Sequence, residues 1–398
     1  MVQGLLMLSL AACELQTTTP TPPPATLTPS AAVSSTETEA PAAETPLPSD
    51  IPVPTPENLN SYSLPEGYNP LTGLPVEDQS LLDRRPIAVK VTLYPRSNRP
   101  QWGLGLADIV YEYYHNNDLT RFNAIFYGQN ADWVGPIRSA RLPDEHLMET
   151  YKSVLAFASA DSRIREALYN RYPAWRLISI LEGECPPNPV CRYDPEVYNH
   201  LLANTARLSD YVDATDGDND KPNLEGMHFA DQKPKTNDEV ERIYTTYSYG
   251  SYNYWEYDAG ERVYYRYQDA WDAVGGRERS YYLLTDRLTG NAISADNVVV
   301  LFTNHFHTVY VPANGSTPET EVVDMDFVGS GEAYAFRNGL AYELVWKREA
   351  GGMLALQFAD GTPYDFKPGN TWFQVVNDSS RLDREGNSWY FTFVWRKN

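Results

Sequence analysis

The densest group of charged and hydroxyl side chains in an apolar context is the segment GPIRSAR, residues 135–141. Arg138 and Arg141 contribute two guanidinium groups and Ser139 a hydroxyl, immediately before a predicted helix. Guanidinium forks and the free amides of a helix N-terminus bind phosphate, sulfate or carboxylate groups. The segment therefore predicts an anion-binding site.

Acidic side chains decide whether this segment binds a ligand or only pairs internally. Asp108 and Glu112 lie on one predicted strand, and Arg121 lies on the next. If these strands are adjacent, Asp108 and Arg121 could meet the arginines of residues 135–141 at one end of a sheet. An acid that faces several arginines is a possible cation-plus-phosphate site. The alternative is a structural ion-pair cluster in which Asp108, Glu112 or Asp144 pairs with the arginines.

A tyrosine-rich segment is the second candidate surface, because nine of the 29 tyrosines fall within residues 244–267. The two-residue period of a strand places Tyr247 with Tyr249, and Tyr252 with Tyr254, on common faces. If exposed, these side chains would form an amphipathic platform for sugar rings or extended peptides. The alternative is that they are half-buried strand formers.

Cysteine and histidine are scarce. Cys185 and Cys191 could close a small disulfide loop in an oxidising compartment, or remain two free thiols. His305 and His307 share a predicted strand face, and His228 could add a third ligand. No zinc-type spacing supports a metal centre, so we expect neither a metal nor a cofactor.

The common catalytic motifs are missing from the sequence. It has no Gly-x-Ser-x-Gly and no Walker pattern, and residues 103–107 lack the third glycine of a dinucleotide loop. This favours a binding protein over an enzyme. Two alternatives stay open. The order of the acid and arginine motifs resembles enzymes that attach phosphate-linked glycopolymers to bacterial walls, and exposed edge strands would suit a scaffold that recruits another protein.

Strand and helix patterns alternate from Arg84 to about residue 210, and strands dominate afterwards. The patterns predict strands at residues 87–93, 108–114, 121–127 and 154–158, and helices at 143–152, 161–171 and 194–208. After residue 221 they predict a hairpin at 244–267 and strands at 298–311, 322–328, 333–336, 340–346, 354–358 and 372–376. Asn338-Gly339 and Asp360-Gly361 are expected hairpin turns, since both tolerate positive φ.

The first residues predict where in the cell the protein is located. Leu10-Ala11-Ala12-Cys13 follows a short apolar run and is typical of a lipoprotein signal at residues 1–13, with Cys13 as the acylated residue. Residues 14–66, rich in Thr and Pro, are expected to form a disordered linker. We therefore expect an extracytoplasmic protein anchored to the bacterial cell membrane through lipid alone.

Charge excludes one class of partner. The formal net charge is −21, and the first 83 residues hold ten acids and no Lys or Arg. The chain has no basic cluster that could displace the counterions of a nucleic acid, so we expect no nucleic-acid partner. The expected ligand is anionic or a glycan.

Several short motifs follow one another in an order that resembles the YerB-like family of predicted bacterial lipoproteins, a family without an assigned reaction. The motifs are Asn69–Gly73, Arg85–Val89, Arg99–Gln101, Ala107–Glu112, Thr120–Phe122, Gly135–Arg141, Asp296–Val300, Gly329–Gly331 and Pro368–Trp372. The resemblance implies an α+β fold, with a layered sheet/sheet/helix N-terminal part and a mostly antiparallel β C-terminal part. We expect an N-terminal α/β domain at residues 67–220 and a β-rich domain at 221–398.

Overall fold

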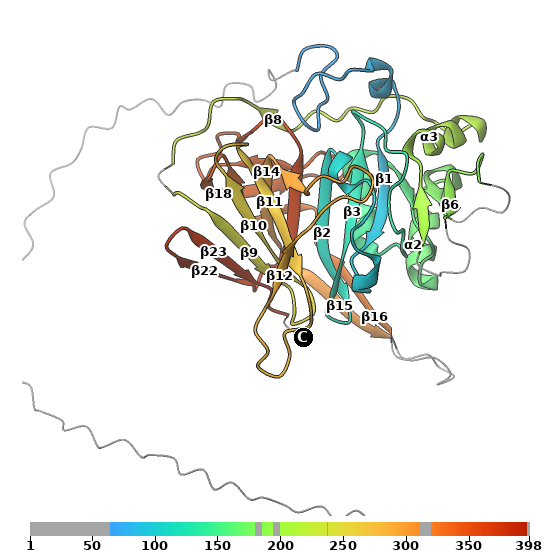
Figure 1. Ribbon diagram of the computed structural model, residues 1–398. Helices are drawn as coiled ribbons and strands as arrows, with labels where there is room; N and C mark the ends of the chain where they lie inside the picture. Colours follow the sequence, from blue (N-terminus) through green and yellow to red (C-terminus); the bar gives the residue numbers. More distant parts are fainter. Residues whose placement is uncertain (1–63, 180–184, 194–199, 237, 311–319, 396–398) are drawn as a thin grey trace, which may run out of the picture. The chain divides into compact units, whose positions relative to one another are not determined.

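Two large β-sheets organise the computed structural model, which describes residues 64–179, 185–193, 200–236, 238–310 and 320–395 (Figure 1). In spatial order, the larger sheet of this described part contains ten strands: β19 (Ala355–Gln357), β18 (Leu340–Arg348), β17 (Gly329–Arg337), β14 (Asn297–Thr303), β21 (Thr371–Asn377), β2 (Ile109–Asn116), β3 (Leu119–Phe126), β1 (Ile87–Thr92), β4 (Val154–Ala156) and β5 (Leu177–Ile178).

The second sheet contains, in spatial order, β12 (Tyr281–Leu283), β11 (Val263–Asp269), β10 (Tyr252–Asp258), β9 (Arg242–Thr246), β23 (Ser388–Thr392) and β22 (Arg381–Glu385), and β13 (Ser294–Ala295) also pairs with β11. Smaller pairs are β15 (His305–Tyr310) with β16 (Thr320–Met325), β20 (Asp365–Phe366) with β8 (His228–Phe229), and β6 (Val190–Arg192) with β7 (Leu201–Ala203).

Helices are few in the part of the chain that the structure describes. The α-helices there are α1 (Leu142–Tyr151), α2 (Ser162–Arg171) and α3 (Thr205–Ala214). Short 3-10 helices are η1 (Gln79–Asp83), η2 (Arg96–Asn98), η3 (Leu104–Leu106) and η4 (Ala174–Arg176). This content confirms the predicted α+β class.

The two sheets pack face to face through aromatic side chains. The ring centroids of Trp255 on β10 and Trp372 on β21 lie 5.0 Å apart, and Phe336 on β17 lies 5.5 Å from Trp389 on β23. α1 and α2 bury residues such as Met148 and Leu168 against the other face of the larger sheet, and α3 packs against the inner core. Because the larger sheet is covered on both faces, its central strands are buried throughout.

Strands from both predicted domains share one sheet. β2 pairs in parallel with β21, with Ile109 opposite Thr371 and Tyr113 opposite Val375. β21 in turn pairs in parallel with β14. Hydrogen bonds of a single sheet therefore run across the predicted boundary at residues 220 and 221.

Local signals explain most element boundaries. Asp161 and Asn204 cap α2 and α3 by accepting from the amides of Arg163 and Arg207. Asn338 and Gly339 turn the β17–β18 hairpin with φ values of 53° and 73°, as predicted. The predicted helix at residues 194–208 is correct only at its end. Residues 194–199 lie outside the described residues, 201–203 form β7, and 205–208 belong to α3, which begins after the Asn204 cap.

Candidate functional site

The segment 135–141 lies along the edge of β1 and carries its arginines onto the helix-covered face of the larger sheet. Thr92 donates its amide to the Pro136 carbonyl at 3.0 Å, and Arg138 donates to the Lys90 carbonyl at 2.9 Å. The segment then turns into α1 at Leu142. Main-chain hydrogen bonds thus fix the positions from which its side chains project.

Three predicted arginines gather here, and we call Arg121, Arg138 and Arg141 the arginine cluster. The Nη1 atoms of Arg121 and Arg141 both donate to the carbonyl oxygen of Ser139, at 2.7 and 3.5 Å. Charge repulsion acts on Arg121 from both Arg141 and Arg138. The Ser139 hydroxyl lies 3.1 Å from that of Ser159. All three guanidinium-bearing residues are half-buried, so the cluster reaches solvent.

A buried polar network supports the arginine cluster from below. The Asp144 carboxylate at the start of α1 accepts from Lys90 Nζ at 3.2 Å, from Asn123 Nδ2 at 2.8 Å, and from the Tyr113 hydroxyl. Its other oxygen accepts from the Arg141 amide at 2.7 Å. One carboxylate therefore orients the first turn of the helix and neutralises one buried cation.

Positive charges outnumber carboxylates at this place among the described residues. Lys90, Arg121 and Arg141 bring three basic groups, Asp144 is the carboxylate buried among them, and Asp161 also acts on Arg141. Burial, partly offset by Asp144, lowers the pKa of Lys90 to about 7. Burial, Arg141 and Arg138 hold the pKa of Arg121 well below its ordinary value. An anion would relieve the repulsion that both shifts reflect.

The sequence interpretation missed several members of this network. His115 on β2 is buried, its Nδ1 has no hydrogen-bond partner among the described residues, and burial and nearby cations hold its pKa well below the ordinary value. Lys90 and Asn123 were also missed, as was Tyr113. The available signal was a lysine inside the apolar strand IAVKVT, where a charge requires a buried partner.

The expected convergence of Asp108 and Glu112 on the arginines is wrong. In the β2–β3 hairpin Tyr113 faces Arg121, whereas Asp108 precedes Ile109, which faces Ile125. Asp108 therefore lies at the opposite end of the hairpin, where its carboxylate accepts from the amides of Tyr127 and Gly128. Burial raises the pKa of Asp108 to about 6.

Glu112 points to the other face of the sheet. Its carboxylate pairs with Arg266 at 2.7 Å and accepts from Thr120 and Asn253. The alternation of side chains along a strand separates it from the arginine cluster, because Arg121 shares the face of Tyr113. Adjacent strands were predicted correctly, but their register and facing were not specified by the motifs.

The predicted tyrosine platform is also corrected. Tyr247 and Tyr252 are buried at 4% and 0% exposure, Tyr249 is 66% exposed, and Tyr254 is half-buried. The four side chains therefore do not form one exposed surface. Tyr247 packs in the core between the sheets. Tyr252 shares the strand face of Tyr254 but is buried there, because its hydroxyl donates to the Trp271 carbonyl and its ring packs against Tyr281.

A different row of tyrosines crosses the outer face of the second sheet. Tyr390, Tyr244, Tyr254 and Tyr267 lie in register on neighbouring strands. Their rings stack on one another, with centroids 4.7 Å apart for Tyr244 and Tyr390 and 4.5 Å for Tyr254 and Tyr267. Since the ring faces cover each other, little open face is left for a sugar.

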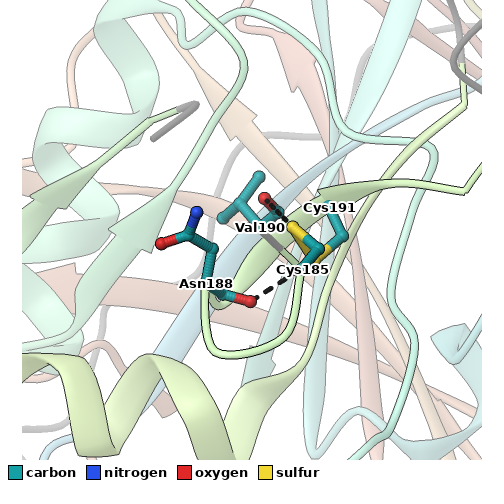
Figure 2. Close-up of a disulfide and its surroundings, with 4 residues drawn as sticks. All are labelled: Cys185, Asn188, Val190 and Cys191. Atoms are coloured by element: carbon teal, nitrogen blue, oxygen red, sulfur yellow. Dashed lines mark hydrogen bonds between the residues drawn. A yellow bond between two sulfur atoms is a disulfide. The ribbon is translucent and has the colours of Figure 1, made fainter. Parts of the chain in front are cut away.

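Figure 2 shows Cys185 and Cys191 joined in a disulfide. The two sulfur atoms lie beside the main-chain carbonyls of Val190 and Asn188 (Figure 2). The bridge closes a short loop that ends within β6, to which Cys191 belongs. The predicted acylation site, Cys13, lies outside the described residues.

The histidines occupy separate environments. His305 Nδ1 lies 2.9 Å from the Thr303 carbonyl, His307 pairs with Glu321 at 2.7 Å, and His228 is on β8. Within the described ranges, no three His, Cys, Asp or Glu side chains gather as metal ligands. No helix of the described chain is long and apolar enough to cross a bilayer.

Comparisons with known proteins agree on one family. Residues 71–184 match the family model described as "Protein of unknown function (DUF3048) N-terminal domain", and residues 243–373 match the corresponding C-terminal domain. A curated protein of Bacillus subtilis (strain 168), named "Putative lipoprotein YerB", is 28% identical over 319 residues, which are 78% of this chain and 86% of that protein. The crystal structure of the YerB protein from Bacillus subtilis shares the fold, with a TM-score of 0.63 and 24% identity over 78% of this chain and 96% of the other.

Proposed function

Because the chain belongs to the DUF3048 family, whose relative YerB is named as a lipoprotein, we propose a lipid-anchored extracytoplasmic protein that binds an anionic ligand at the arginine cluster. The name of that relative supports the anchor, as does the Leu10–Cys13 motif. An acylated Cys13 and the Thr- and Pro-rich segment after it would hold the folded part outside the membrane.

One observation carries the ligand assignment. Arg121 Nη1 donates to the Ser139 carbonyl at 2.7 Å. Arg141 Nη1 donates to the Ala140 carbonyl at 2.9 Å and lies 3.5 Å from the same Ser139 oxygen, although both residues are cations in a half-buried place. Asp144, the carboxylate beneath them, is already shared by Lys90, Tyr113 and main-chain and amide donors. The guanidinium groups of Arg121 and Arg141 are thus held close together above Lys90, and Asp161 is the further carboxylate that acts on Arg141, so these three cations outnumber the two carboxylates.

The donors suit a phosphate- or sulfate-type group. Each guanidinium presents a planar fork of donors, which matches the oxygens of a tetrahedral anion. Ser139 and Ser159 add hydroxyl groups at the same place. Recognition through charge is favoured over recognition of a sugar ring, because the tyrosine faces of the second sheet are stacked together.

Asp108 argues against the enzymatic alternative. A phosphate-transfer site of the kind considered for this sequence needs an acid beside the arginines to hold a cation. Asp108 lies at the far end of the hairpin, and the oxygens of Asp144 already accept from several donors. A protein that only binds an anion does not need a free carboxylate from Asp108 or Asp144.

Calorimetric titration with pyrophosphate and with sulfate tests the proposal. We expect saturable binding to the parent protein, and a loss of affinity of about tenfold or more in Arg121→Gln and Arg141→Gln, because each removes charge-assisted hydrogen bonds. Arg384→Gln is the matched control, since Arg384 forms a surface pair with Glu343. Equal affinities for all four proteins, or no binding to the parent, would refute the proposal.

A further inference from the structure

A second pocket lies on the opposite face of the β2–β3 hairpin from the arginine cluster. Its volume is about 480 Å³. Its walls are four aromatic side chains and its charged groups are two carboxylates: Tyr114, Tyr247, Phe393, Trp395, Asp118 and Glu321. Among the residues that the structure describes, no Lys or Arg lines it. Its composition is therefore the reverse of the arginine cluster in charge.

The aromatic walls are held by packing between the two sheets. Tyr114 on β2 stacks on Phe393 with ring centroids 5.0 Å apart, and Trp395 lies 5.5 Å from Tyr114. Tyr247 lies 6.0 Å from Phe393. Tyr114, Tyr247 and Phe393 are at least nine-tenths buried, and Trp395 is half-buried. The rings are thus fixed by packing, and Trp395, the most exposed of the four, presents most of the aromatic surface that a ligand can reach.

The carboxylates differ in how far they are engaged. Glu321 on β16 accepts from the Asn117 amide at 2.9 Å and pairs with His307 at 2.7 Å. Asp118 is exposed at the hairpin turn, and its carboxylate has no hydrogen bond or ion pair with any described residue. The negative charge of Asp118 therefore remains available at the pocket.

From this geometry we infer that the pocket binds an alkylated ammonium group, such as the trimethylammonium of choline. Aromatic faces attract a cation through their quadrupoles, and clusters of aromatic rings are the usual binding place of quaternary ammonium ions. Asp118 and Glu321 supply complementary charge. A primary ammonium fits less well, because it needs several hydrogen-bond acceptors and Glu321 already accepts from two groups.

The test is a titration of the protein with each of four solutes, in which binding is measured by calorimetry or ligand-observed NMR. We expect tetramethylammonium and choline to bind, and the uncharged isostere 3,3-dimethylbutan-1-ol and the primary amine ethanolamine to bind at least several-fold more weakly. Equal binding of the isostere would show an apolar pocket without charge selectivity and would overturn the inference. Absence of binding by both quaternary ions would overturn it as well.

Variants locate the binding. Asp118→Asn keeps a residue that tolerates the positive φ of 59° at this turn, and removes the charge. We expect about a 2- to 5-fold loss of affinity for tetramethylammonium for each carboxylate removed in Asp118→Asn combined with Glu321→Gln, as is usual for charge pairs near the surface. Asp383→Asn, on the exposed strand β22, is the matched control and should bind as the parent does. An unchanged affinity in the double variant would contradict the assignment.

Competition with tetramethylammonium can show whether the ammonium group belongs to a lipid headgroup or to a free solute. Vesicles of phosphatidylcholine that compete with tetramethylammonium would indicate a lipid headgroup, and a free solute is indicated if choline binds but vesicles do not compete. Arg121→Gln should leave tetramethylammonium binding unchanged, because Arg121 projects from the other face of the hairpin. This inference is therefore separable from the proposed anion site.

Discussion

Arg266 and Glu112 form a buried ion pair that joins the two sheets, with Nη2 2.7 Å from Oε2 and both side chains at 0% exposure. Glu112 belongs to β2 of the larger sheet and Arg266 to β11 of the second sheet. The guanidinium also lies 5.0 Å from the ring of Trp372 and 5.1 Å from that of Phe122. The pair therefore lies in the core between the sheets together with buried polar side chains, among them Thr120, Asn253 and Gln268.

Removing one partner of this pair should destabilise the protein strongly. In Glu112→Gln, Arg266 keeps its charge in the core but loses the compensating carboxylate, and such changes cost about 3–5 kcal/mol. Urea denaturation should show this loss. Arg384→Gln, which breaks a surface pair with Glu343, should cost less than about 1 kcal/mol. Similar losses in both variants would show that Glu112 does not compensate Arg266.

Gly369→Ala should also destabilise the protein, by more than about 2 kcal/mol. Gly369 has φ of +137°, and a Cβ there would lie 1.9 Å from Asp296 Oδ2. Its amide donates to the Thr72 carbonyl at 2.8 Å, so the backbone has little room to move. The thermal midpoint and the free energy of unfolding measure the effect.

Gly361→Ala is the control for Gly369→Ala. Gly361 has φ of +89°, and nothing lies within 4 Å of its added Cβ. That variant carries backbone strain alone, of about 1–2 kcal/mol. The difference between the two variants isolates the clash with Asp296, and equal losses would contradict it.

The motifs that carried the family resemblance meet at one place that the sequence did not reveal. Asn69 donates to Asp108 at 3.0 Å, and the amide of Asn370 donates to Asp296 at 3.2 Å. The amide of Gly369 donates to the Thr72 carbonyl and so connects the segment of Asn370 with the segment of Asn69. Asp108 and its neighbours therefore fasten the starts of β2, β14 and β21 together, which is a structural role.

Strand and helix positions could be predicted from periodicity and caps, whereas the meeting points depended on register. The arginine cluster was found because Arg138, Ser139 and Arg141 are close in sequence and Arg121 lies on an adjacent strand. Asp108 was wrongly added to it, since nothing in the sequence states that Tyr113 and not Asp108 faces Arg121. A one-residue difference in facing likewise sends Glu112 to the opposite side.

The arginine cluster should cost stability when no anion is bound. Arg121→Gln removes a repelled cation, and loses one hydrogen bond to Ser139. We expect its free energy of unfolding in chloride buffer to stay within about 1 kcal/mol of the parent or to rise, because binding sites often hold unfavourable charges. Sulfate should stabilise the parent more than the variant. A large loss in chloride, with no response to sulfate, would indicate a purely structural cluster.

Lys90 should make the stability of the protein depend on pH. Burial, together with Arg121 and Arg141 and partly offset by Asp144, lowers the pKa of Lys90 from 10.5 to about 7. Between those values the unfolded chain binds a proton that the folded protein does not. Stability therefore rises with pH in that range, at up to about 1.4 kcal/mol per pH unit, and this contribution is constant below the folded pKa.

Unfolding free energies of the parent and Lys90→Met, measured from pH 7.5 to 9.5, isolate this contribution from the tyrosines and other groups that titrate in both proteins. The parent should gain stability relative to the variant as pH rises.

The affinity for sulfate should also depend on pH. Sulfate keeps its charge across this range and below it. Its affinity for the parent should therefore increase as pH falls through about 7, because a protonated Lys90 adds positive charge behind Arg121 and Arg141. Burial holds the pKa of His115 well below its ordinary value, so His115 does not add a positive charge in this range. A constant stability difference, together with a sulfate affinity independent of pH, would show that Lys90 stays protonated beside Asp144.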